Sequence, residues 1–278
     1  MSKNSGKTRS FFTLQRKYLA FPYMLFLLLF VVAPILIIVF YAFTNENMEF
    51  SFDACVGFFT NPNKLNVLFV SLFIAFQTTL ICLLIGYPLA YFLADKKVNK
   101  NAVLITLFIA PMWINFVLRT WATRDLLTWI GLSGGKYPYL ATLIGMVQNY
   151  LPFVVLPLYT TMLKLDHSQI EAAYDLGANP RQVFFKNIIP QSIPGIVSAC
   201  MMTFMPTMSS YVIANKMSEG NKQIIGSMIE DYFLKRTTEL SNHIGSVVSL
   251  VMLLIVGVSL VAEKALSKDP NTKKGEVY

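Results

Sequence analysis

The sequence predicts an all-α integral membrane protein with six transmembrane helices. Hydrophobic residues make up 55% of the 278 positions and charged residues 14%, whereas soluble domains carry about 25% charged residues. Charges are also absent from six long stretches: 18–43, 65–94, 101–118, 137–163, 187–215 and 240–262. Each stretch supplies the roughly 17–25 mainly apolar residues with which a helix crosses a hydrocarbon layer about 30 Å thick.

The segments around these spans follow in order. The first span is expected to stay uncleaved, because its apolar run is much longer than the roughly 7–15 residues of a signal-peptide core. The outer loop 44–64 is long enough for a small surface element. Residues 119–130 predict a short interfacial helix, and residues 223–235 predict an outer helix whose apolar positions recur near helical spacing.

Prolines lie within the first five spans, where they are expected to kink or break the helices. Membranes tolerate such breaks where neighbouring groups or a water-filled path satisfy the freed backbone. Broken helices also recur around transport sites. The prolines concerned are Pro22, Pro34, Pro88, Pro111, Pro152, Pro157 and Pro206.

The distribution of Lys and Arg predicts that both termini are cytoplasmic. The N-terminal tail carries five basic residues and no acid, and an even number of spans returns the C-terminus to the same side. In this orientation 15 basic residues face the cytoplasm and eight face outward, in agreement with the positive-inside rule. Membrane topology therefore explains the net charge of +8, and no nucleic-acid partner is expected.

The sequence offers no constellation for catalysis or metal binding. The two histidines, His167 and His243, fall on opposite predicted sides of the membrane, so they cannot form a metal site together. The spans contain no Asp, Glu, Lys or Arg, whereas ion-coupled carriers usually keep such residues in the membrane. We therefore expect a transport subunit without a catalytic site, metal or cofactor of its own, driven by energy from another chain.

The segment 166–190 is the most informative part of the chain, because it predicts two capped helices on one cytoplasmic loop. Asp166 is the expected N-cap of the first, with Gln169 as its capping-box partner, and Gly177 ends it. Asn179 caps the second, with Pro180 at the first helical position. Such a loop predicts a docking surface.

The first of these helices, residues 167–176, would be about 15 Å long at 1.5 Å per residue. Ile170, Ala173 and Tyr174 would share one face, while Glu171 and Asp175 would form an acidic i, i+4 stripe. The small residues Ala172 and Ala173 would permit close approach to a partner.

The same segment resembles the cytoplasmic loop of permeases of binding-protein-dependent ABC importers. The family pattern is Glu-Ala-Ala, three residues, Gly, nine residues, usually Ile, any residue, then Leu-Pro. The resemblance implies that ATPase-coupling residues are Glu171, Ala172, Ala173, Asp175, Gly177 and Pro190. Two positions depart from the pattern: Asn187 replaces the usual Ile, and Ile189 the usual Leu. The sequence alone gives no account of Asn187.

Residues 65–262 are most similar to permeases of spermidine/putrescine ABC importers, on features such as Gly86-Tyr87-Pro88, Arg119-Thr120 and Ile225-Gly226. The resemblance implies the type I ABC importer permease fold in a bacterial cytoplasmic membrane. It also implies a second, similar permease, two ATPase subunits that bind ATP and Mg, and an extracytoplasmic solute-binding protein.

Polar and aromatic residues predict the substrate path. The candidates are Trp113, Asn115, Gln148, Asn149, Thr203 and Tyr211 in the bundle, with Glu230 and Asp231 at the outer mouth for a polycation. The predicted divisions are 1–64 (tail, first span and outer loop), 65–262 (transmembrane domain with coupling loop 166–190) and 263–278 (cytoplasmic tail). Polyamine import is the favoured function. Import of another small solute (a metal ion, thiamine or sulfate) is the alternative, and a stand-alone secondary carrier is a further one.

Overall fold

The computed structural model describes residues 16–95, 99, 102–235 and 239–266, and within these ranges the regular structure is helical, joined by turns and loops, with an isolated β-bridge between Thr44 and Phe50. The predicted cytoplasmic tails lie almost wholly outside the described residues. Among the described residues, five helices are long and apolar enough to cross a membrane: Phe21–Ala42, Pro62–Ala94, Pro138–Met162, Pro180–Ser209 and Ser241–Ala265. They agree with five of the six predicted spans.

The third predicted span, 101–118, is broken after Pro111, where the sequence predicts a kink or break, and its second part turns away as a separate helix. Helix α5 (Val103–Ile109) ends in the 3₁₀ turn η2 (Ala110–Trp113), and α6 (Phe116–Trp129) leaves at 93°. Pro111 has no N–H to continue the ladder, Ile114 is extended, and the Asn115 side chain caps α6 by accepting the Val117 N–H at 2.8 Å. A run of uncharged residues indicates the length of a span but not the angle at which it bends.

The fifth span also differs from its predicted limits, 187–215. One continuous helix runs through α9 (Pro180–Val183), the π-helical turn η3 (Phe184–Ile188) and α10 (Ile189–Ser209). The chain breaks at Ser210, and α11 (Tyr211–Met217) follows as a separate helix. The span therefore begins inside the predicted coupling loop, in the polar turn that the charge criterion excluded.

The remaining elements complete the bundle. The first span comprises α1 (Arg16–Leu27), η1 (Leu28–Val32) and α2 (Ala33–Ala42). The outer loop contains α3 (Asp53–Phe59), and α4 (Pro62–Ala94) is the long second span. Helix α7 (Pro138–Met162) precedes α8 (His167–Asp175), while α12 (Ile225–Glu230) and η4 (Asp231–Lys235) form the predicted outer helix before α13 (Glu239–Leu266).

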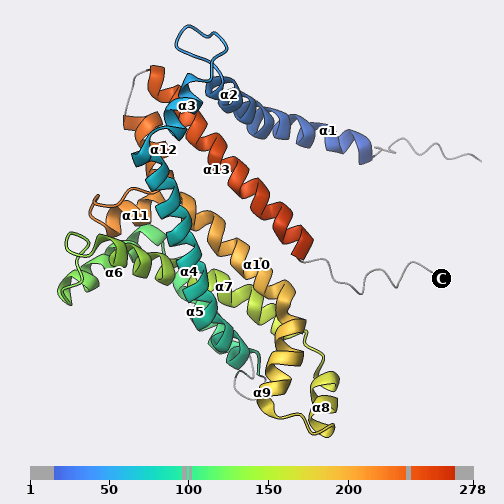
Figure 1. Ribbon diagram of the computed structural model, residues 1–278. Coiled ribbons are helices and arrows are strands. Elements are labelled where there is room, and N and C mark those ends of the chain that lie inside the picture. The colour runs from blue at the N-terminus through green and yellow to red at the C-terminus, as the bar shows by residue number, and fades with distance from the viewer. Residues whose placement is uncertain (1–15, 96–98, 100–101, 236–238, 267–278) are drawn as a thin grey trace, which may run out of the picture.

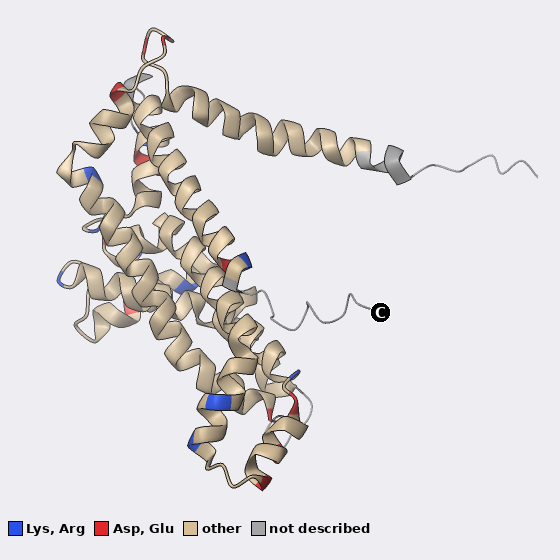
Figure 2. Ribbon diagram, turned by 45° about the vertical axis from the view of Figure 1, so that its right-hand side comes forward, with Lys and Arg blue, Asp and Glu red and all other residues tan. Residues whose placement is uncertain are grey.

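The first span stands apart from the rest of the bundle (Figure 1), and none of its apolar window is buried. It joins the bundle near its outer end, where the Tyr41 carbonyl lies 2.9 Å from Nδ1 of His243 on α13. Charged residues are sparse along the spans and gather toward loops and helix ends (Figure 2). This distribution is the one that a hydrocarbon layer imposes.

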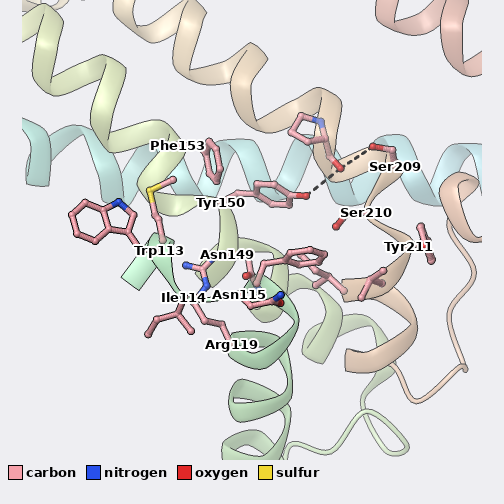
Figure 3. A pocket seen from close by; sticks show the side chains of 15 residues that line it. Trp113, Ile114, Asn115, Arg119, Asn149, Tyr150, Phe153, Ser209, Ser210 and Tyr211 are labelled. Atoms are coloured by element: carbon pink, nitrogen blue, oxygen red, sulfur yellow. Dashed lines mark hydrogen bonds between the residues drawn. The ribbon is translucent and has the colours of Figure 1, made fainter. Parts of the chain in front are cut away.

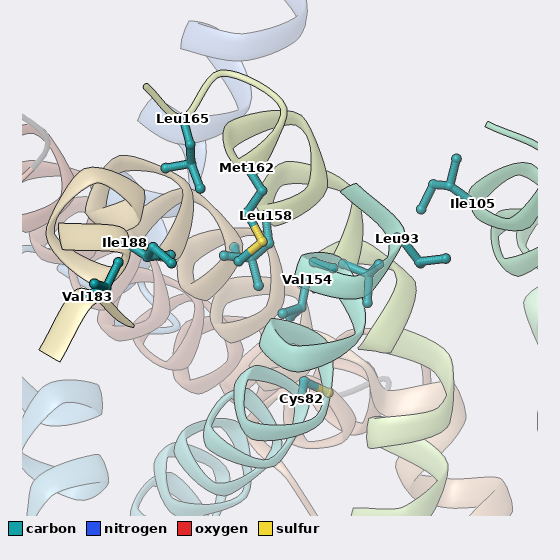
Figure 4. Packing of buried hydrophobic residues seen from close by; sticks show 12 residues of the cluster. Cys82, Leu93, Ile105, Val154, Leu158, Met162, Leu165, Val183 and Ile188 are labelled. Atoms are coloured by element: carbon teal, nitrogen blue, oxygen red, sulfur yellow. The ribbon is translucent and has the colours of Figure 1, made fainter. Parts of the chain in front are cut away.

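The core lies where α4, α7 and the α9–α10 helix pack together. Figure 4 shows buried side chains from all three meeting there. They include Cys82, Leu93, Val154, Leu158, Met162, Val183 and Ile188. Small residues permit the close approach, as is usual between membrane helices. At Gly195 on α10, an added Cβ would lie 2.4 Å from Oγ1 and 2.7 Å from Cβ of Thr161 on α7.

We predict that Gly195→Ala destabilises the fold, by about 1–3 kcal/mol, because overpacking forces the two helices apart. The matched control is Gly257→Ala on α13, where no atom lies within 4 Å of an added Cβ. Thermal unfolding of the detergent-purified protein measures both. Equal melting temperatures for the two variants would contradict the close α7–α10 contact.

Candidate functional site

The loop 166–190, which the sequence predicts to be cytoplasmic, folds as the two predicted capped helices. The carboxylate of Asp166 accepts the backbone N–H of Ser168 at 3.0 Å, its hydroxyl at 2.5 Å and the Gln169 amide at 2.9 Å. The hydrogen bond from the Ser168 side chain, supported by those from Gln169 and the backbone, lowers the pKa of Asp166. The N-cap of α8 is therefore a carboxylate.

The predicted capping box between Asp166 and Gln169 is wrong in its second bond. In a capping box the third helical residue would accept the backbone N–H of the cap. That N–H instead donates to Oε1 of Gln191, 25 residues later on α10, at 3.1 Å. The Gln169 side chain is occupied by the Asp166 carboxylate. A long-range contact has replaced the local one.

The C-terminal end of α8 and the start of α9 confirm the predicted stop and restart. Gly177 has φ +81°, and the N–H groups of Gly177 and Ala178 bond to the carbonyls of Tyr174 and Ala173, a Schellman motif. Asn179 and Gln182 then form a complete capping box with Pro180 at the first helical position. The loop is thus built from local rules at both turns.

The exposed face of α8 carries most of the predicted coupling residues. Glu171, Ala172, Asp175 and Gly177 are exposed, and Pro190 is exposed at the start of α10. Ala173 instead packs, together with Ile170, against the protein's own core, so it is not part of the outward face. Leu176 is 89% exposed, an apolar side chain at the loop tip that the sequence reading did not single out.

A cavity of about 570 Å³ opens at the two breaks in the bundle, between η2–α6 and α10–α11 (Figure 3). Its lining residues are Met112, Trp113, Ile114, Asn115, Phe116, Arg119, Asn149, Tyr150, Phe153, Pro206, Ser209, Ser210, Tyr211, Val212 and Ile213. The broken helix end is satisfied from within: the hydroxyls of Tyr150 and Ser209 both donate to the Pro206 carbonyl at 3.2 Å (Figure 3).

Two polar side chains of the cavity have atoms left without a partner. The Asn149 amide donates to Gly145 at 2.9 Å and Thr120 at 3.3 Å, while its buried Oδ1 accepts no hydrogen bond. The buried Nε of Arg119 has no acceptor either. Among the described residues that line this cavity, Arg119 is the only Asp, Glu, Lys, Arg or His side chain. Buried polar atoms of this kind usually mark a place where water or a ligand binds.

The structure brings together half of the predicted path residues. Trp113, Asn115, Asn149 and Tyr211 line the cavity. Gln148 is exposed on another face of α7, and Thr203 is buried within α10 away from the cavity. The sequence reading missed Arg119 and Tyr150 as lining residues. The position of Arg119 just after the break at Pro111–Asn115 could have indicated that it lines the cavity.

Glu230 and Asp231 lie on the outer helix rather than in this cavity. Nζ of Lys235 is 2.7 Å from Asp231 and 3.6 Å from Glu230, and the hydrogen bond that Lys235 donates to Asp231 raises the pKa of Lys235. Glu230 lines a neighbouring cavity of about 280 Å³ that shares Ser209 and Tyr211 with the larger one. The two acids are thus partly neutralised by a lysine of the same chain.

Comparisons with known proteins agree in relating this chain to membrane components of transport systems. Residues 13–268 match the family described as binding-protein-dependent transport system inner membrane component. A protein of Salmonella typhimurium (strain SL1344) named spermidine/putrescine transport system permease protein PotB is 31% identical over 271 residues, which covers 90% of this chain and 93% of the relative. The protein of the same name from Escherichia coli (strain K12) is 31% identical over 267 residues, covering 89% and 96%.

Solved structures show the same fold at low identity. A chain of a bacterial alginate ABC transporter, in complex with an alginate pentasaccharide-bound periplasmic protein, superposes with a TM-score of 0.71 at 14% identity, covering 91% of this chain and 93% of that one. A chain of an amino acid ABC transporter with histidines superposes with a TM-score of 0.55 at 18% identity, covering 77% and 99%. The polypeptide therefore has the fold of ABC importer permeases.

We predict that Asp166→Ala frays the first turn of α8, because Ser168 and Gln169 lose their acceptor. Hydrogen exchange should be several-fold faster at the amides of this turn. The control is Asp175→Ala at the opposite end of the helix, where a carboxylate is unfavourable to the helix dipole. In the native protein the pKa of Asp166 is lowered, so the cap is complete above its ordinary value of about 3.9. It is lost only as the pH falls through the lowered native pKa. Unchanged exchange in Asp166→Ala would contradict the cap.

Proposed function

The chain belongs to the family of binding-protein-dependent transport system inner membrane components, and from this premise we propose that it is the permease subunit of an ATP-driven polyamine importer. Its closely matched relatives named as spermidine/putrescine permeases, aligned over about nine-tenths of the chain, are the single observation that carries this substrate class. The protein is a multi-pass inner-membrane component, and it forms half of a translocation path.

The loop 166–190 is the part that engages a separate ATPase. Its support is physical: α8 is a short, doubly capped helix whose Glu171, Ala172 and Asp175 face outward while Ile170 and Ala173 hold it to the core. Such a helix presents a rigid surface at little cost in ordering on binding. ATP and Mg are bound by two ATPase partners, and this chain contributes no catalytic group to hydrolysis.

The cavity at the helix breaks is the part of the path that this chain provides. Trp113 and Tyr211 offer aromatic faces, which attract ammonium groups, and Trp113 is 82% exposed. A second, similar permease completes the path, and an extracytoplasmic solute-binding protein delivers the solute. Glu230 lies at the neighbouring cavity, where its negative charge would favour entry of a cation.

One observation favours a second candidate, the import of an anionic solute such as sulfate. Arg119 is the only acidic or basic side chain in the lining of the main cavity, and its buried Nε lacks an acceptor. A guanidinium attracts an oxyanion through paired N–H donors and repels a polycation. If the cargo is a polyamine, Glu230 at the neighbouring cavity and carboxylates of the other subunits would offset this repulsion.

We predict that a reconstituted complex of this permease, its partner permease, the ATPases and the binding protein hydrolyses ATP faster when the binding protein is loaded with spermidine or putrescine. Stimulation by sulfate or another solute instead would keep the permease assignment and discard polyamines. Failure to assemble with any ATPase would overturn the importer itself.

The variant Arg119→Gln separates the two candidates in the same assay. It should leave stimulation by spermidine intact or increase it, because a positive charge is removed from the path. For an anionic cargo it should reduce stimulation at least tenfold, the effect of about 1.4 kcal/mol.

We predict that Glu171→Ala lowers uptake severely and weakens ATPase association, while the spans keep their thermal stability, because Glu171 makes no contact that holds the fold. Gly177→Asp should act in the same way. Glu49→Ala is the matched control, since it removes the same charge from the exposed outer loop at the opposite end of the bundle. Normal uptake in Glu171→Ala would remove the coupling role from this face.

A further inference from the structure

Helix α8 has little apolar anchorage of its own. None of its nine residues is buried, and only Ile170 and Ala173 are partly buried against the core. A helix of this length is marginal in isolation. Something else must fix its position and direction relative to the spans.

Hydrogen bonds from the foot of the fifth span supply this fixation. Nδ2 of Asn187 donates to the backbone carbonyl of Gln169 at 3.2 Å. Oε1 of Gln191 accepts the backbone N–H of Asp166 at 3.1 Å. These two bonds hold backbone groups at the first turn of α8, the N–H of its cap and a carbonyl three residues on.

The two amides on the fifth span also hold one another. Asn187 and Gln191 are four residues apart, so they share one face of the helix. Nε2 of Gln191 donates to Oδ1 of Asn187 and lies 3.5 Å from Oε1 of Gln169. We call the four residues Asp166, Gln169, Asn187 and Gln191 the amide clamp. It explains the polar residue at position 187, where the family pattern usually has Ile.

The clamped helix leads directly to the cavity. From Pro180 to Ser209 it is continuous over 30 residues, about 45 Å at 1.5 Å per residue. Its far end supplies Pro206 and Ser209 to the cavity lining. A displacement of α8 therefore acts on the N-terminal end of the helix Pro180–Ser209, whose C-terminal end borders the cavity.

We propose that Asn187 and Gln191 are positioning residues that lock α8 to the fifth span, so that motion of the ATPase-binding helix reaches the cavity without slipping. Directional hydrogen bonds to backbone groups fix both the position and the rotation of α8. An apolar side chain at position 187 would pack but would permit sliding. This inference rests on the proposed coupling of the loop to an ATPase, and it assigns the residues that transmit the force.

The test compares Asn187→Ile and Gln191→Leu in the reconstituted complex, with two quantities measured on each: ATP hydrolysis and solute uptake. Both variants should assemble and hydrolyse ATP, but uptake per ATP hydrolysed should fall at least fivefold. A merely structural role would lower the amount of complex and both rates together, leaving the ratio unchanged. An unchanged ratio in both variants would overturn the clamp.

The matched control is Asn63→Leu, which removes an exposed side-chain amide from the first turn of α4, outside the loop 166–190 and the cavity. The ratio should stay at the wild-type value in this variant. If the apolar variants fail to assemble, Asn187→Asp carries the test. It keeps the acceptor for Gln191 and loses only the donor to Gln169, and it should lower the ratio; a wild-type ratio would overturn the proposal.

The wild-type complex separates this proposal from the one on which it rests. Absence of ATPase assembly or of uptake in the wild type would refute the importer function. A coupled wild type with fully coupled clamp variants would refute only the clamp.

Discussion

The fold depends on one constraint: within hydrocarbon every backbone N–H and C=O must find a partner inside the protein. This is why the described chain is helical almost throughout and why departures from helix are confined to a few places. The main departures inside the bundle are the turn at Ile114–Asn115 and the break at Ser210. Each is repaired locally, by the Asn115 cap in one case and by the hydroxyls of Tyr150 and Ser209 on the Pro206 carbonyl in the other. Both breaks border the same cavity. Irregular backbone and solvent-accessible space therefore occur together, as the constraint requires.

The fifth span connects the two regions to which function is assigned. Its N-terminal end is polar and lies in the loop 166–190, and its C-terminal end is broken at the cavity. Between these two ends Gly195 brings α10 against Thr161 of α7. The middle of the fifth span is therefore packed tightly against α7. Tight packing makes a helix move as a unit with its neighbours rather than bend. A short surface helix clamped to such a span can therefore act on groups far beyond its own reach.

Much of this was readable from the sequence, because the rules concerned are local. Uncharged runs gave the spans, and cap residues gave both ends of α8 and the start of α9. The errors arise where three-dimensional contacts determine the direction of a helix, the face that a side chain occupies or its hydrogen-bond partner. In the run 101–118 Pro111 predicted a kink or break, but the 93° angle depends on the extended Ile114 and the Asn115 cap that follow it. Gln148 and Thr203 lie on apolar spans, but the face each presents depends on packing. The Asp231–Lys235 pair was visible as an i, i+4 spacing, whereas the bond from Asp166 to Gln191 joins residues 25 positions apart.

The charge of the cavity bears on how a solute could be selected. Among the described residues that line the cavity, Arg119 is the only acidic or basic side chain, and its buried Nε has no acceptor. The side chain as a whole is only partly buried, so the unmet requirement is an acceptor for this one donor. Water, a ligand or a group from another chain can supply it, because none of the acids in the described part of this chain lines the cavity. The half-path is thus electrostatically incomplete by itself. Discrimination between a polycation and an anion is then a property of the assembled path. The charged groups that the other subunits place opposite Arg119 determine the sign of the electrostatic potential there.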